Sequence, residues 1–297
     1  DNYPMTAVSH VYFNGIEADI DSGMTAPQIL ANVIAIKQKC FDIDALPTLI
    51  FTPKPSMYNS EYELKPVYTA MMRHIAFTGK PTLLLVGDDI VDYYSEGGQS
   101  WSICDTVQEM LPKAFVINKG VAGDKISDVV ARFQTDVLDE IPTMCAIIVG
   151  MNDLWTASMN DIATLAQDYI NLAILCKANN IEPVVFKYDM TLEQIETYCN
   201  MYGTPSWNTP VQILYYYKCM AELVEVVAKT NNVIFLSAYH DVIDKKGYIV
   251  DTMVANDKVH LSEEGARAVG HYIATAVKER LQQLIEGQDN YKFRFVN

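Results

Sequence analysis

Residues 82–90, TLLLVGDDI, are the clearest indication of the fold, because an unbroken apolar run from Leu83 to Val86 ends at Gly87 and two adjacent carboxylates. A short continuous apolar run predicts a strand that is covered on both faces. Similar runs, each followed by a helical stretch, indicate a parallel sheet. They occur at residues 114–118, 145–150, 183–187 and 233–238.

The segments between these runs predict the helices of the same domain. The last one begins after Ser262, a good N-cap residue, and places Glu263 and Glu264 in the positive first turn. We therefore expect a three-layer α/β/α sandwich, of the flavodoxin-like kind, with a parallel sheet of about five strands over residues 81–297. The helical candidates are residues 99–110, 124–140, 160–179, 208–230 and 262–285.

The first 80 residues read differently and carry no catalytic signature. A helix is expected at residues 25–40 and a strand at 48–53, and the last nine residues, 289–297, add either a strand or a packed tail. We interpret residues 1–80 as an N-terminal extension or a small accessory domain, compatible with contact to a partner.

The chain has 297 residues and a formal net charge of −15. Such a charge repels phosphate backbones and anionic membrane surfaces, so neither nucleic acid nor membrane insertion is expected. No apolar run approaches the roughly 20 residues of a membrane-spanning helix.

The six cysteines include no CxxC pair, and we expect buried free thiols, or disulfides if the protein is secreted. Because the sequence starts at Asp1 without a methionine, a removed leader or a trimmed sequence is expected. This favours secretion over a cytoplasmic location but leaves the compartment open.

Four short motifs occur where strands end or just before the last helix, which is where open α/β sheets collect their ligand sites. Together they resemble the SGNH/GDSL hydrolase family, whose pattern is a GDS turn, a glycine turn, a GxND turn and a late DxxH. The resemblance covers about two thirds of the chain. The motifs are GDDI at 87–90, NKGVAGD at 118–124, GMND at 150–153 and DKVHL at 257–261.

The resemblance implies an ester hydrolase acting on acyl or acetyl groups of a small molecule or carbohydrate, without cofactor or catalytic metal. Asp89 would occupy the nucleophile position at the centre of the site. Gly120 and Asn152 would offer an N–H and a side-chain NH₂ to a substrate oxyanion. His260 would be the general base, and Asp257 would orient its ring. Asp124 and Asp153 are assigned to turn and cap structure.

The residue at position 89 departs from the family, which has the nucleophilic serine there. A carboxylate is a weaker nucleophile toward esters and would form an acyl anhydride instead of a serine ester. Two carboxylates beside His260 would also raise its pKa and make it a poorer base near neutral pH.

Three interpretations follow from this replacement. The first is a pseudo-hydrolase that keeps the pocket as a binding or structural module. The second is an active hydrolase in which Asp89 is the nucleophile, or acts with His260 to activate water. In the third, Asp88, Asp89, Asp257 and His260 hold a divalent metal ion.

Residues 188–207, YDMTLEQIETYCNMYGTPSW, separate the fourth predicted strand from the helix at 208–230. We expect this stretch to form either a lid or pocket wall, or a plain helix buried against the sheet.

Overall fold

The structure is a computed structural model that describes residues 10–13, 22–24, 28–29, 31–32, 35–36, 46–49, 81–92, 94–96, 99–203 and 208–288. Two compact units make up the chain. The larger unit comprises Pro81–Leu138 and Pro142–Leu281. The other consists of Asp1–Lys80, Asp139–Ile141 and Gln282–Asn297.

A parallel five-stranded sheet forms the centre of the larger unit, in the order β6-β3-β7-β8-β9. The predicted α/β class, the parallel sheet and its five strands are confirmed. This order places the first strand, β3, between the second and third, so the strand order reverses at the β3 and β7 pair. The strands are β3 (Thr82–Gly87), β6 (Phe115–Gly120), β7 (Met144–Ile148), β8 (Glu182–Lys187) and β9 (Ile234–Ser237).

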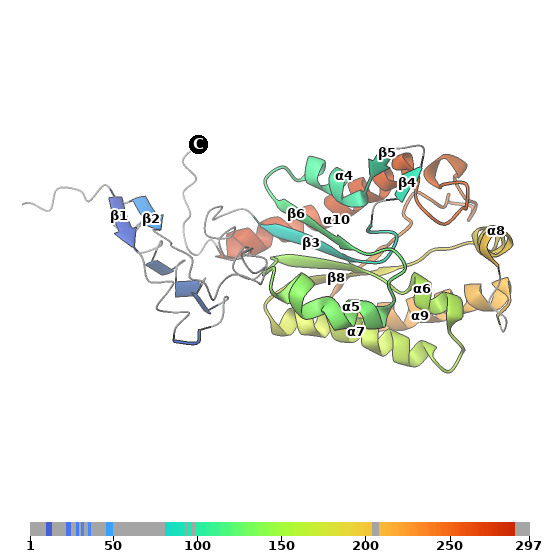
Figure 1. Cartoon of the computed structure of the whole chain (residues 1–297), viewed down its shortest axis with the longest axis horizontal. Coiled ribbons are helices and arrows are strands. Elements are labelled where there is room, and N and C mark those ends of the chain that lie inside the picture. The colour runs from blue at the N-terminus through green and yellow to red at the C-terminus, as the bar shows by residue number, and fades with distance from the viewer. Residues whose placement is uncertain are drawn as a thin grey trace, which may run out of the picture. The chain divides into compact units, whose positions relative to one another are not determined.

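Helices cover both faces of this sheet (Figure 1). One face carries α4 and α10, and the other carries α5, α7 and α9. The bounds are α4 (Ile103–Met110), α5 (Ile126–Phe133), α6 (Met151–Thr156), α7 (Ile162–Ala178), α8 (Leu192–Tyr202), α9 (Pro210–Thr230) and α10 (Glu263–Gln288).

Burial explains why the strands read as continuous apolar runs. Every residue of β3 and of β7 is buried, because helices lie on both sides. Gly87 ends β3 where the chain passes very close to its neighbour: a Cβ at this position would lie 1.7 Å from the backbone oxygen of Ile148. Only glycine permits this approach, and the Asp88 N–H then donates to the same oxygen at 3.1 Å.

Two predicted helices differ from the structure. Residues 99–101 form a strand, β5 (Gln99–Trp101), antiparallel to β4 (Tyr94–Glu96), and the helix starts only after Ser102. A capping box between Ser102 and Asp105 sets that start. The helix predicted at 124–140 starts at Ile126 as α5 and continues as a π-helical turn, η2 (Gln134–Leu138).

The stretch at 188–207 contains a regular helix, α8, which begins after a capping box formed by Thr191 and Gln194. One side is buried through Ile195 and Cys199, while Tyr202 at its end is 62% exposed. The helix therefore has one face in the core and one exposed face. Residues 204–207 lie outside the described residues.

In the smaller unit, β1 (His10–Phe13) pairs in parallel with β2 (Leu46–Leu49). The described residues within the predicted helix at 25–40 are helical, and β2 overlaps the strand predicted at 48–53 at its first two residues. Residues 50–53 and 289–297 lie outside the described residues. The extension or accessory domain at 1–80 stays a prediction.

Four of the five described cysteines are buried, and all five are free thiols; Cys40 lies outside the described residues. Over the described part of the chain, no helix has both the length and the apolar character needed to cross a bilayer.

The close approach at Gly87 predicts a large cost for adding one methyl group there. Gly87→Ala should lower the free energy of unfolding by about 3 kcal/mol or more, because the methyl collides with backbone that cannot move aside. Urea unfolding followed by circular dichroism measures this loss.

Gly247→Ala is the matched control. Gly247 has φ +85° but nothing within 4 Å of a Cβ, so only backbone strain of about 1–2 kcal/mol is expected. Equal losses in the two variants would contradict the steric explanation.

Candidate active site

The four sequence motifs meet at one edge of the sheet. Asp89 follows β3, Gly123 follows β6 and Asn152 lies in the first turn of α6, directly after β7. His260 comes from the loop that precedes α10. Because the strands are parallel, their carboxyl ends converge, and side chains from distant parts of the sequence come within hydrogen-bond distance.

Asp257 holds His260 in one orientation. Its Oδ1 accepts the backbone N–H groups of Val259 and His260, each at 3.0 Å, and its Oδ2 lies 2.5 Å from Nδ1 of the His260 ring. Lys258 adopts a positive φ of 62° within this turn. The loop therefore directs the other ring nitrogen, Nε2, toward the end of β3.

Asp89 lies where these loops converge. Its Oδ1 lies 3.5 Å from His260 Nε2. Its Oδ2 accepts two hydrogen bonds, from Asn152 Nδ2 at 2.8 Å and from the Gly123 N–H at 2.9 Å. One oxygen of the Asp89 carboxylate thus contacts His260, and the other oxygen accepts hydrogen bonds from two N–H donors.

The charges in the site stabilise one another. Burial by itself raises the pKa of Asp89, but hydrogen bonds from His260, Asn152 and Gly123 outweigh it and lower the pKa to about 2. For His260 burial acts in the other direction and lowers the pKa. The carboxylates of Asp257 and Asp89 outweigh burial and raise the His260 pKa to about 9. At neutral pH the site is an imidazolium between two carboxylates.

The structure brings together four of the five predicted site residues and places Gly120 in a different role. The Gly120 N–H donates to Asn118 Oδ1 at 2.8 Å, at the end of β6. A Cβ on Gly120 would lie 2.3 Å from the Asp92 nitrogen, so this glycine serves close backbone packing. The N–H that reaches Asp89 belongs to Gly123, whose φ of +84° turns the loop. The sequence signal that could have identified this donor was the second glycine of the same motif, Gly123, three residues after Gly120.

Arg132 fixes the loop that supplies this N–H. Its guanidinium contacts Asp124 Oδ2 at 2.7 Å and donates to the backbone oxygens of Lys119 and Gly87. The Asp124 backbone oxygen accepts a second contact from Asn152 Nδ2, at 3.0 Å. Asp124 is thus a structural residue, as its assignment to the turn predicted. Asp153 is one too, because its Oδ2 accepts the first N–H of α5.

Asp88 points into the core and away from Asp89. It is completely buried, and its Oδ2 accepts the Tyr188 hydroxyl at 2.7 Å while Oδ1 accepts the Ile90 N–H at 3.2 Å. Burial raises its pKa to about 7, although these hydrogen bonds act in the opposite direction. Its oxygens therefore serve the core, and among the described residues no group of three or more His, Cys, Asp or Glu side chains is placed to hold a metal ion.

Three buried tyrosines underlie the site, and each holds a different loop. Tyr188 donates to Asp88, Tyr217 donates to the Met151 oxygen at 3.1 Å, and Tyr239 donates to the Val259 oxygen at 2.7 Å. The Tyr188 ring centroid lies 6.0 Å from each of the other two rings. We call these three residues the tyrosine cluster.

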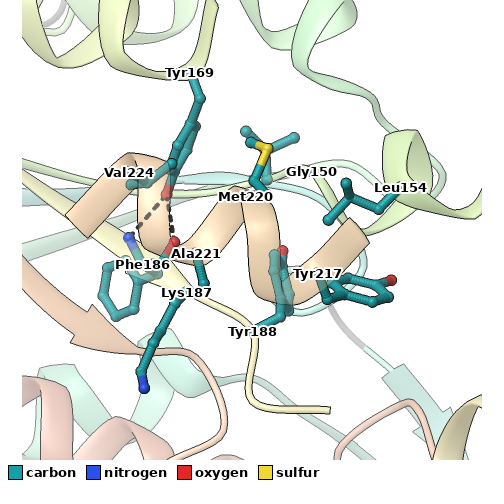
Figure 2. A pocket seen from close by; sticks show the side chains of 11 residues that line it. Gly150, Leu154, Tyr169, Phe186, Lys187, Tyr188, Tyr217, Met220, Ala221 and Val224 are labelled. Atoms are coloured by element: carbon teal, nitrogen blue, oxygen red, sulfur yellow. Dashed lines mark hydrogen bonds between the residues drawn. The ribbon is translucent and has the colours of Figure 1, made fainter. Parts of the chain in front are cut away.

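Figure 2 shows Tyr188 and Tyr217 beside a small cavity that is also lined by Gly150 and Met220. In the same view, the Tyr169 hydroxyl contacts the backbone of Phe186 in β8. Phenolic groups therefore satisfy the backbone at the site's inner wall. The sequence carried no signal for the tyrosine cluster, because its members lie on three separate elements.

A sequence profile of the GDSL-like lipase/acylhydrolase family matches residues 85–268, more than half of the chain. The chain is also 32% identical over 87 residues to an acetylxylan esterase from Geobacillus stearothermophilus. That match covers 25% of this chain and 40% of the esterase, so it spans less than half of that relative.

Solved structures show the same fold. The lipase/acylhydrolase from Enterococcus faecalis superposes with a TM-score of 0.52 at 21% identity, covering 67% of this chain and 96% of that one. A protein assigned to the lipolytic G-D-S-L family from Desulfitobacterium hafniense gives a TM-score of 0.51 at 19% identity, covering 66% and 99%.

The ion pairs of His260 predict a pH dependence of stability. Because its pKa is raised from 6.5 to about 9, their contribution is complete below pH ~6.5 and is lost as the pH rises through about 9. We expect the wild type to lose about 2–3 kcal/mol of unfolding free energy across that interval relative to His260→Gln. NMR titration of the ring should give the same pKa. A His260 ring pKa near 6.5 in the wild type would contradict this explanation. So would a ring pKa that does not fall when Asp89 is replaced in Asp89→Asn.

The hydrogen bond from Tyr188 to Asp88 predicts a second pH effect. Tyr188→Phe should cost about 1–3 kcal/mol at pH 9, where Asp88 is charged, and clearly less at pH 5, where it is protonated. Unfolding in urea at both pH values measures the difference. Tyr217→Phe is the control. The Tyr217 hydroxyl donates to a backbone oxygen, so this variant should lose the same unfolding free energy at both pH values.

Proposed function

The chain belongs to the GDSL-like lipase/acylhydrolase family, and from this premise we propose that it binds an ester or carbohydrate ligand without hydrolysing it. Asp89 stands where the family has its nucleophilic serine. The protein is then a binding module built on a hydrolase fold. The ligand class follows from the family and from the esterase relative.

The observation that carries the proposal is the position of Asp89 Oδ2. It accepts both N–H donors that point into the site, from Asn152 and Gly123. In an acyl hydrolase such donors stabilise the negative charge that develops on the substrate oxygen. Here a permanent negative charge already occupies them. A substrate carbonyl would have to displace a carboxylate bound through two short hydrogen bonds.

The protonation states argue in the same direction. A carboxylate with a pKa of about 2 is a weak base and a weak nucleophile. His260, with a pKa of about 9, is protonated at neutral pH and cannot accept a proton from water. Neither attack by Asp89 nor water activation by the pair is favoured, and these two forms of an active hydrolase are the less supported alternatives.

The metal-assisted alternative is weaker still. It requires Asp88 to turn toward Asp89, whereas the Asp88 carboxylate is buried and accepts the Tyr188 hydroxyl and the Ile90 N–H. Breaking these bonds would leave buried donors without partners.

Replacing the aspartate tests the proposal directly. The wild type and Asp89→Ala should leave 4-nitrophenyl acetate uncleaved. Asp89→Ser should cleave it at least about 100-fold faster than the wild type, because a serine frees both N–H donors and removes one of the two carboxylates that raise the pKa of His260. Release of 4-nitrophenol at pH 8 gives the rates.

The double variant Asp89→Ser with His260→Ala is the control and should return to the background rate. The proposal is wrong if the wild type hydrolyses the ester and Asp89→Ala abolishes that activity.

A further inference from the structure

Aromatic side chains from α6 and α8 lie beside the candidate active site. Trp155 and Tyr198 line a small hollow together with Met151, Asn152, Met190 and Val259. Two members of this lining border the site, because Asn152 donates to Asp89 and Val259 precedes His260. The hollow therefore opens next to the Asp89 carboxylate.

The rings are fixed by contacts with one another. Trp155 and Tyr198 meet edge to face with centroids 4.5 Å apart, and Tyr198 and Tyr202 lie 4.6 Å apart at an angle of 41°. Such pairs hold their geometry because the edge of one ring is attracted to the face of another. We call Trp155, Tyr198 and Tyr202 the aromatic surface.

The core does not account for this surface. Tyr202 is 62% exposed and the neighbouring Met201 is 52% exposed, although both lie on a helix whose other side is buried. Burial and the nearby Asp89 charge both raise the pKa of Tyr198, which places this ring within the electrostatic reach of the site. Trp155 and Tyr198 are half-buried, so the surface is exposed mainly through Tyr202. Ordered aromatic rings that are partly exposed beside a buried polar site are typical of ligand recognition.

We propose that the aromatic surface stacks against one face of a neutral sugar ring while a hydroxyl group of the same sugar donates to Asp89 Oδ1. This deepens the proposed function and rests on it only for the location of the site. The C–H face of a sugar is apolar and packs on aromatic rings. An ionised carboxylate is a hydrogen-bond acceptor only, so it suits the donor hydroxyls. The 3.5 Å contact from His260 leaves Asp89 Oδ1 able to accept one.

Two observations separate this ligand from other chemistries. The hollow has a volume of about 10 Å³, room for roughly one water molecule, so an acyl group cannot enter it. The net charge of −15 disfavours anionic sugars. A neutral sugar that lies on the aromatic surface, outside the hollow, satisfies both.

The test is binding of bare oligosaccharides by the full chain. Xylohexaose, cellohexaose and mannohexaose, which contain no ester, are titrated by calorimetry. We expect at least one to bind, and Tyr202→Ala to weaken that binding about three- to tenfold. Asp89→Asn should also weaken it, because the amide is a poorer acceptor. Tyr248→Ala, which removes an equally exposed tyrosine (65%) elsewhere, should leave binding unchanged.

Several results would overturn the inference. They are no binding by any of the three oligosaccharides, equal affinity in the wild type and Tyr202→Ala, and displacement of the sugar by tetramethylammonium at the same concentration as by competing sugar, which would indicate a cation site. Because these probes carry no ester, the outcome is independent of whether the wild type hydrolyses esters.

In Asp89→Ser, a second readout is available. Adding Tyr202→Ala should raise KM for acetylated xylohexaose about three- to tenfold, and by more than it raises KM for 4-nitrophenyl acetate, because only the former has a sugar chain to stack. An equal rise for both esters would mean that Tyr202 supports the site generally and does not bind sugar.

Discussion

The close passage of β3 against β7 at Gly87 is the constraint on which the site depends. Because no side chain separates this residue from the Ile148 oxygen, the chain passes close to β7 and turns there, and the next two carboxylates enter different environments. Asp88 enters the core and meets Tyr188, whereas Asp89 faces His260 and Asn152. One glycine thus separates a structural carboxylate from the carboxylate at the centre of the site.

Electrostatics then decides what the site favours. Asp257 and Asp89 hold His260 as an imidazolium, and Asn152 and Gly123 hold Asp89 as an anion. Each charge strengthens the others, so the arrangement is stable at rest and poorly suited to transferring a proton. A hydrolase needs a neutral histidine and vacant N–H donors, whereas a binding site needs neither, and this difference is the reason for proposing a binding role.

Two groups of aromatic residues surround the site, the tyrosine cluster and the aromatic surface. Beneath the site, the tyrosine cluster ties the Asp88, Met151 and Val259 loops to the core through hydroxyl groups. Beside it, the rings of the aromatic surface are ordered by their mutual contacts, and Tyr202 is exposed. Aromatic residues therefore serve two purposes: buried hydroxyl groups donate to Asp88 and to backbone oxygens in the core, and partly exposed rings lie at the surface.

The sequence was enough to predict the fold class and the positions of the sheet's strands, because apolar runs are local patterns in a parallel sheet. The approach of residues 89, 152, 257 and 260 was expected from the resemblance of four short motifs to the hydrolase family. Gly120 was expected to face the site and does not, since either glycine of the loop fits the pattern and only packing against Asp92 separates them. The tyrosine cluster, the aromatic surface and the capture of both N–H donors by Asp89 were decided by the tertiary structure alone. They join residues far apart in the chain, whose distances no local pattern encodes.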